Sequence, residues 1–188
     1  MRTPLKQREL EDAIADATRE AVTALFRENA GQHFYYLSLI TPGEGHAPFL
    51  SAWSREALAS AAGGDAESVR LLKWSYADSP FYAYREELFD EVARLFAARP
   101  SMNSATSDDE WFAEVAWRVQ GMERAVAQLD AEGLFGRGEE RYAIVVNVEF
   151  MPPDYTNSAR ARWLNSPEVL VEWLAEAAEP EPESASGD

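Results

Sequence analysis

Aromatic side chains gather around a single carboxylate in residues 71–82, LLKWSYADSPFY. Trp74 and Tyr82 flank Asp78 in this segment, and a second carboxylate, Glu149, lies near the end of an apolar strand pattern. A carboxylate beside phenol and indole groups can exchange protons with a substrate or hold a small ligand. A cleft that joined Asp78 to Glu149 and shifted their pKa values would indicate such chemistry. These four residues are therefore the candidate ligand site of the sequence.

The same segment also has a purely structural interpretation. Ser79 followed by Pro80 is typical of a helix start, with the serine as N-cap and the proline as first helical residue. Asp78 would then lie near the positive end of the helix dipole. Trp74 and Phe81 would anchor the end of a strand and the start of that helix in the core. This interpretation needs no ligand, and it is the one that we favour.

One tryptophan departs from the pattern of a predicted helix over residues 107–132. The apolar stripe of that helix consists of Val115, Val119, Met122, Val126 and Leu129. Trp117 lies about 200° around the helix from this stripe, with Gly121 and Arg124 on its own face. A tryptophan above a glycine with an arginine one turn further is typical of an interaction hot spot. Alternatively the helix is covered on both sides, with Trp117 beneath the C-terminal helices.

The motifs of common catalytic sites are missing from the sequence. The chain has no cysteine, which excludes disulfides, thiolate catalysis and Fe–S clusters. His33 and His46 flank one predicted hairpin, and neither stands in a catalytic or metal-binding motif. The chain has no nucleophile elbow, no phosphate-binding glycine loop and no EF-hand loop. We therefore expect no cofactor, no metal and no catalytic residue.

The composition indicates an acidic globular protein. The 188 residues are 46% hydrophobic and carry a formal net charge of -16. Such a surface repels nucleic acid and anionic membranes, whereas it would steer a basic protein partner toward the chain. No apolar run reaches the ~20 residues of a membrane helix, and the N-terminus lacks the apolar region of a signal peptide. We expect a cytoplasmic protein whose partner is a basic protein.

The hydrophobic periodicity predicts one α+β domain over residues 1–178, followed by a disordered Pro, Glu and Ser tail at 179–188. Strands are expected at 33–41, 47–53, 69–75 and 141–150, in a mainly antiparallel sheet of about four strands. Several helices should pack on this sheet. They are expected from Thr3-Pro4 to Gly31, at 54–62, 80–99, 107–132 and 157–164, and from Ser166-Pro167 onward.

The order of short motifs along the chain resembles a known family. These motifs are HFYYLSL, PFLSAWSREAL, LKWSYADSP, EGLFG, YAIVVNVEF and SARARWLNSP. Together they are similar to the bacterial family catalogued as domain of unknown function 4303, over most of residues 5–175. The resemblance implies no catalytic residues, because that family has no assigned activity. Small acidic α+β proteins also include the immunity proteins that neutralise secreted toxins, which is an analogy of general type.

Two functions follow from these observations. The first is a non-enzymatic, acidic protein-interaction module of the immunity or antitoxin type, with Trp117 as an anchor for the partner. The second is a small-molecule binder or carboxylate-dependent enzyme, with its site near residues 74–82 and the end of strand 141–150. The first explains the net charge, the missing catalytic motifs and the tryptophan outside the apolar stripe.

Overall fold

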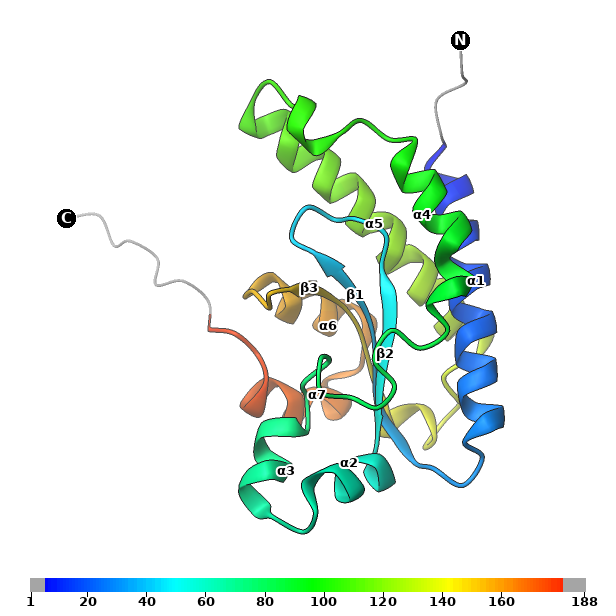
Figure 1. The fold of residues 1–188 in the computed structure, drawn as a ribbon, viewed down its shortest axis with the longest axis vertical. Coiled ribbons are helices and arrows are strands. Elements are labelled where there is room, and N and C mark those ends of the chain that lie inside the picture. The colour runs from blue at the N-terminus through cyan, green and yellow to red at the C-terminus, as the bar shows by residue number, and fades with distance from the viewer. Residues whose placement is uncertain (1–5, 181–188) are drawn as a thin grey trace, which may run out of the picture.

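The computed structural model describes residues 6–180 and arranges helices around a small sheet (Figure 1). The α-helices are α1 (Gln7–Glu28), α2 (Arg55–Ala62), α3 (Ala66–Leu72), α4 (Asp90–Ala97), α5 (Asp108–Glu132), α6 (Thr156–Leu164) and α7 (Pro167–Glu176). The 3-10 turns are η1 (Glu86–Phe89), η2 (Met102–Ser104) and η3 (Arg141–Ala143). The strands are β1 (Phe34–Pro42), β2 (Phe49–Ser54) and β3 (Val145–Met151).

Within these residues the sheet has three strands in the order β2-β1-β3. β1 and β2 form an antiparallel hairpin, whereas β1 and β3 are parallel, with Leu37 beside Val146. The α+β class is confirmed, but the expected antiparallel sheet of about four strands is wrong. The parallel pairing of β3 with β1 is possible because a long, mainly helical connection separates them in the chain and lets β3 enter the sheet from the same end as β1.

The expected strand at 69–75 is instead helix α3 and the turn that follows it. The side chain of Asp65 caps this helix by accepting a hydrogen bond from the backbone N–H of Ser68 at 2.8 Å. Val69 and Leu72 are three residues apart, so both lie on the helix face that packs against the core. The apolar residues of this segment fit the helical period as well as the alternation of a strand, and the cap at Asp65 distinguishes the two.

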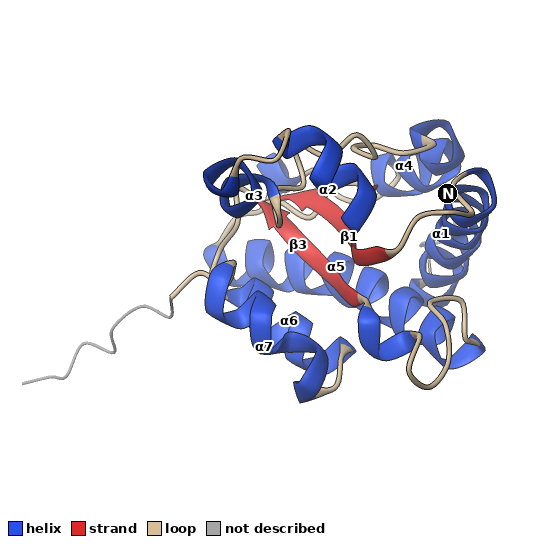
Figure 2. Cartoon of the chain, turned by 90° about the horizontal axis from the view of Figure 1, so that it is seen from below, coloured by secondary structure: helices blue, strands red, loops and turns tan. Residues whose placement is uncertain are grey.

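The sheet separates two apolar cores, and Figure 2 shows helices on both of its sides. Leu37, Leu39 and Val148 point into the larger core, which α1, α4 and α5 complete. Tyr36 and Trp53 point into the smaller core, which the side chains of α2, α3 and α7 complete. β1 is therefore buried on both faces, which agrees with its nearly continuous run of apolar and aromatic residues.

Most helix positions agree with the sequence. α5 begins after its N-cap Ser107, whose hydroxyl accepts a hydrogen bond from the N–H of Glu110, and it ends at Gly133 in the left-handed region. The helix predicted at 80–99 is wrong in its first half. Residues 80–85 form irregular turns with positive φ at Ala83 and Arg85, and α4 begins only at Asp90. The Ser79 hydroxyl does accept the N–H of Phe81 at 3.0 Å, as an N-cap would, but it also donates to the carbonyl oxygen of Ala52 and closes a turn against β2 where a helix was expected.

The free edge of β3 is covered by side chains of α6 and the residue that follows it. Asn165 forms two hydrogen bonds with the backbone of Val146, and Arg160 donates to the carbonyl oxygen of Val148 at 2.7 Å. Asn157 accepts a hydrogen bond from the N–H of Phe150 at 2.9 Å. These side chains satisfy the backbone groups that a further strand would otherwise pair.

Two predictions fall at the chain ends. The Thr3-Pro4 helix start and all but the first two residues of the 179–188 tail lie outside the described residues. Within residues 6–180, none of the helices combines the length and the apolar character that crossing a membrane would require.

Candidate ligand site and interaction surface

The segment 73–82 crosses the face of the hairpin that carries Ser51 and Trp53, and hydrogen bonds attach it to β2. The indole N–H of Trp53 donates to the carbonyl oxygen of Ser75 at 2.7 Å, and the hydroxyl of Ser51 donates to that of Tyr76 at 2.9 Å. These contacts hold a segment without regular secondary structure as a cover over the sheet. Its aromatic residues thereby reach the core although the segment belongs to no helix or strand.

Glu149 is buried beneath this cover in contact with Tyr36. The hydroxyl of Tyr36 donates to the Glu149 carboxylate at 2.9 Å, and only 5% of Glu149 is exposed. Burial raises the pKa of Glu149, and the hydrogen bond from Tyr36 partly opposes this effect. The Trp74 ring lies 5.9 Å from the Tyr36 ring, so the fold links two of the four candidate ligand residues through a tyrosine that sequence analysis did not single out.

Asp78 and Tyr82 lie apart from this buried pair. Asp78 is exposed and accepts a hydrogen bond from the Ser75 hydroxyl at 2.6 Å, which fixes a local turn. Tyr82 is 46% exposed and packs on Phe49, with their ring centroids 4.8 Å apart. The two groups therefore have local partners of their own, outside the Tyr36–Glu149 contact.

Trp74 also borders a half-open cavity of about 450 Å³ between α2, α3 and α7, which we call the α2–α7 cavity. This volume is in the range of small-molecule sites. The lining residues are Tyr35, Arg55, Leu58, Ala59, Val69, Lys73, Trp74, Ala143, Val145, Glu168, Val169, Val171 and Glu172. Apart from Trp74, sequence analysis missed these residues because they come from six separate elements and the turn after α3.

Lys73 is the centre of an ionic cluster at the mouth of this cavity. Its ammonium group lies 2.5 Å from Glu172 and 2.9 Å from Glu176. Burial alone would lower the pKa of Lys73, but hydrogen bonds to the two carboxylates outweigh it and raise the pKa. The Trp74 indole donates to Glu176 at 2.9 Å, so the cluster joins the 73–82 segment to α7.

The three interface candidates lie where α5 packs against α1. A Cβ on Gly121 would lie 3.3 Å from the Leu10 side chain, and Gly121 is buried. Arg124 remains exposed and forms an ion pair with Glu11 at 3.1 Å. Trp117 is half-buried beneath Arg99, whose guanidinium carbon is 3.8 Å from the ring centroid. α1 and Arg99 therefore cover this face of α5. The alternative considered from the sequence, in which Trp117 lies beneath the C-terminal helices, is not what the structure shows.

The histidines occupy separate local contacts. His33 lies 2.6 Å from Glu56, and His46 lies 2.8 Å from Glu44. In the part of the chain that the structure describes, no three histidine or acidic side chains are grouped closely enough to hold a metal ion.

Comparison with known proteins identifies one family. The model of the family described as "Domain of unknown function (DUF4303)" matches residues 14–166, which is most of the chain. No curated protein and no solved structure shows significant similarity to the chain.

Proposed function

Since the chain belongs to the DUF4303 family, whose description names no activity, we propose its function from the molecule itself. We propose that it is a non-enzymatic binding module for a basic protein partner, of the immunity or antitoxin type. The observation that carries this proposal is the uncompensated negative charge of its surface. The presence of half-exposed aromatic groups beside that charge gives the partner a place to anchor.

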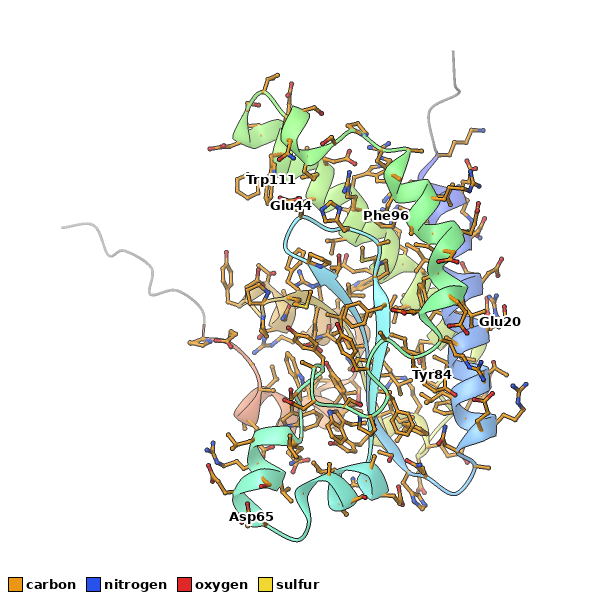
Figure 3. The ribbon with its side chains drawn as sticks, in the orientation of Figure 1. Glu20, Glu44, Asp65, Tyr84, Phe96 and Trp111 are labelled. Atoms are coloured by element: carbon orange, nitrogen blue, oxygen red, sulfur yellow. The ribbon has the colours of Figure 1, made fainter. Side chains whose placement is uncertain are left out.

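Most described arginine and lysine side chains are already engaged with carboxylates, whereas many acids are not. Exposed acids without an ion pair within residues 6–180 include Glu20, Asp78, Glu86 and Asp109. Glu20 points outward from α1, and Asp65 lies at the far turn between α2 and α3 (Figure 3). Negative charge therefore faces solvent both along α1 and at the turn between α2 and α3. Such a field raises the association rate of a basic protein, and salt weakens it.

Trp117 and Arg124 are the proposed contact residues on the α5 face. Both retain exposed surface, because α1 covers Gly121 more completely than it covers its two neighbours. A partner side chain could pack on the exposed part of the Trp117 ring. The ion pair with Glu11 would hold the Arg124 side chain in place beside that contact.

The test is a tagged pull-down from native lysate at low and high salt, read by mass spectrometry and repeated with the purified partner. We expect one stoichiometric basic protein that is lost at high salt. Trp117→Ala should weaken the purified complex, whereas Phe112→Ala, elsewhere on α5, serves as matched control. Absence of a partner at both salt concentrations would contradict the proposal.

A second candidate is a small-molecule binder or carboxylate-dependent enzyme near Trp74 and Glu149. The buried Tyr36–Glu149 contact favours it, because burial raises the pKa of the Glu149 carboxyl, and a carboxyl that keeps its proton to higher pH is better suited to donate it. A thermal-shift screen of metabolites and divalent cations tests it. A compound that stabilises the wild type but not Glu149→Gln supports this candidate, and a screen without any such compound argues against it.

A further inference from the structure

Of the two cations that line the α2–α7 cavity, one has no ion-pair partner within the described residues. Within residues 6–180 the Arg55 guanidinium takes part in no ion pair and no hydrogen bond; it lies 5.9 Å from the centre of the Tyr35 ring. Arg55 is also the first residue of α2, where the helix dipole is positive. Arg55 is exposed, so water solvates its charge in the free protein, and its N–H donors remain accessible to an anion that enters the cavity.

The second cation and the aromatic donors of the cavity are engaged. The Tyr35 hydroxyl donates to the carbonyl oxygen of Lys73 at 2.6 Å, and the Trp74 indole donates to Glu176. Lys73 is matched by two carboxylates. Arg55 is therefore the cation of the cavity that is available to a ligand, and its planar fork of N–H donors suits a carboxylate or phosphate.

The surrounding charges distinguish among anions. Glu168 and Glu172 line the same cavity as Arg55 and Lys73, so the lining has no net positive charge. A dianion such as a phosphate monoester would meet repulsion there, in a protein of net charge -16. A single carboxylate can pair with Arg55 and leave the local charge close to balanced.

The aromatic faces argue against a cationic ligand. Arg55 lies over Tyr35, and the Lys73 ammonium lies 5.3 Å from the Trp74 ring centre. Both rings thus already lie next to cations of the protein itself, which would repel an ammonium ligand placed beside them. The remaining lining, which includes Leu58, Val69 and Val169, is apolar.

We propose that the α2–α7 cavity binds a small amphipathic monocarboxylate. Its carboxylate pairs with Arg55, and its hydrocarbon or aromatic body packs between the apolar side chains of α2, α3 and α7. This site is separate from the surface proposed for the basic partner, and it does not depend on that proposal.

Calorimetric titration with four eight-carbon probes tests the head group directly: octanoate, octanol, octylamine and octyl phosphate. We expect octanoate to bind about tenfold tighter than octanol, the effect of one charge-assisted contact. Octylamine and octyl phosphate should bind more weakly than octanoate. Equal affinity for octanoate and octanol, or tighter binding of either other probe, would overturn the proposal.

Three variants locate the site. Arg55→Gln should abolish the preference for octanoate over octanol, whereas Arg162→Gln, which removes an exposed charge on α6, should preserve it. Ala59→Trp fills the cavity from α2 without changing charge, so it should weaken octanoate and octanol alike. Each variant must retain the wild-type thermal transition. An octanoate preference that persists in Arg55→Gln would contradict the assignment.

A peptide C-terminus could supply the same chemistry as a free acid. N-acetyl-Leu-Leu with a free carboxylate, compared with its amide, separates the two sources. Tighter binding of octanoate identifies a free acid, and tighter binding of the peptide acid identifies a peptide C-terminus. Failure of both to bind would overturn the proposal.

Discussion

Asn165 binds the backbone of Val146 as a neighbouring strand would. Its amide nitrogen donates to the Val146 carbonyl oxygen at 2.7 Å, and its amide oxygen accepts the Val146 N–H at 2.9 Å. Asn165 follows α6 directly, so this pair fixes the end of the helix against the edge of the sheet. The edge of β3 is thus closed by side chains, and its backbone groups are unavailable to another chain.

Asn165→Ala should therefore destabilise the protein by about 2 kcal/mol, because two buried backbone groups of Val146 lose their partners. Urea unfolding measures the change. Asn103→Ala, at an exposed position, is the control and should stay within about 0.5 kcal/mol of the wild type. Equal stability of both variants would show that the edge of β3 needs no side-chain partner. The exposed edge should also make Asn165→Ala self-associate with rising concentration, which ultracentrifugation can detect.

Glu114 joins two arginines between α5 and the loop after α4. It accepts hydrogen bonds from Arg99 at 2.9 Å and from Arg118 at 2.8 Å, and Arg118 is 2% exposed. Glu114→Gln should cost about 3 kcal/mol, because it leaves a buried guanidinium without its anion. Glu91→Gln, which breaks the exposed pair with Arg94, should cost less than about 1 kcal/mol. Chemical unfolding of both variants measures the difference.

The loss in Glu114→Gln should depend on pH. Burial alone would raise the pKa of Glu114, but hydrogen bonds from the two arginines outweigh it and lower the pKa below 4.5. The carboxylate therefore contributes stability above pH 4.5, and this contribution disappears as pH falls through the folded-state pKa. The gap between wild type and variant should be widest near neutral pH and narrow in acid. A gap independent of pH would contradict the ion-pair explanation.

Glu149 should show the opposite dependence. Burial raises its pKa above 4.5, so as pH rises past this value the unfolded chain releases the proton before the folded protein does. Wild-type stability should fall in this window relative to Glu149→Gln, whose amide oxygen can still accept from Tyr36. Thermal unfolding between pH 4 and 8 should thus show the melting-temperature difference growing in favour of the variant. Tyr36→Phe, which removes the donor to the carboxylate, should be destabilised more at high than at low pH.

Capping residues in the sequence correctly predicted where several helices begin and end. Ser107 and Gly133 delimit α5 as their capping roles require, and Ser54 begins α2 in the same way. The pairing of β3 with β1 could not be predicted, because it depends on the path of the chain through α5. The α3 segment was mistaken for a strand because its few apolar residues fit both periods, and Asp65 was the cap that distinguishes them.

In the candidate sites, too, the sequence indicated some residues but not the tertiary partners that surround them. The sequence marked Trp74 and Glu149, but not the tyrosine between them or the partners of Trp74 in α7. Arg55 carries no motif, and its significance depends on the absence of an anion beside it within the described residues. Likewise, Gly121 lies on the predicted face of α5, yet only the position of α1 shows that Leu10 occupies the space above it. Such features are properties of tertiary packing and not of residue spacing.

The variant Trp117→Ala can distinguish a role of this side chain in folding from a role in partner binding. Its ring packs partly against the main core and partly against Arg99, so Trp117→Ala should lower the free energy of unfolding by about 2 kcal/mol, less than for a fully buried tryptophan. A single cooperative transition should remain in thermal unfolding. Phe112→Ala, on a side chain that is 62% exposed, should change stability by less than about 0.5 kcal/mol. If Trp117→Ala abolishes the transition, the ring is needed for folding, and a loss of partner binding in that variant would no longer identify a contact residue.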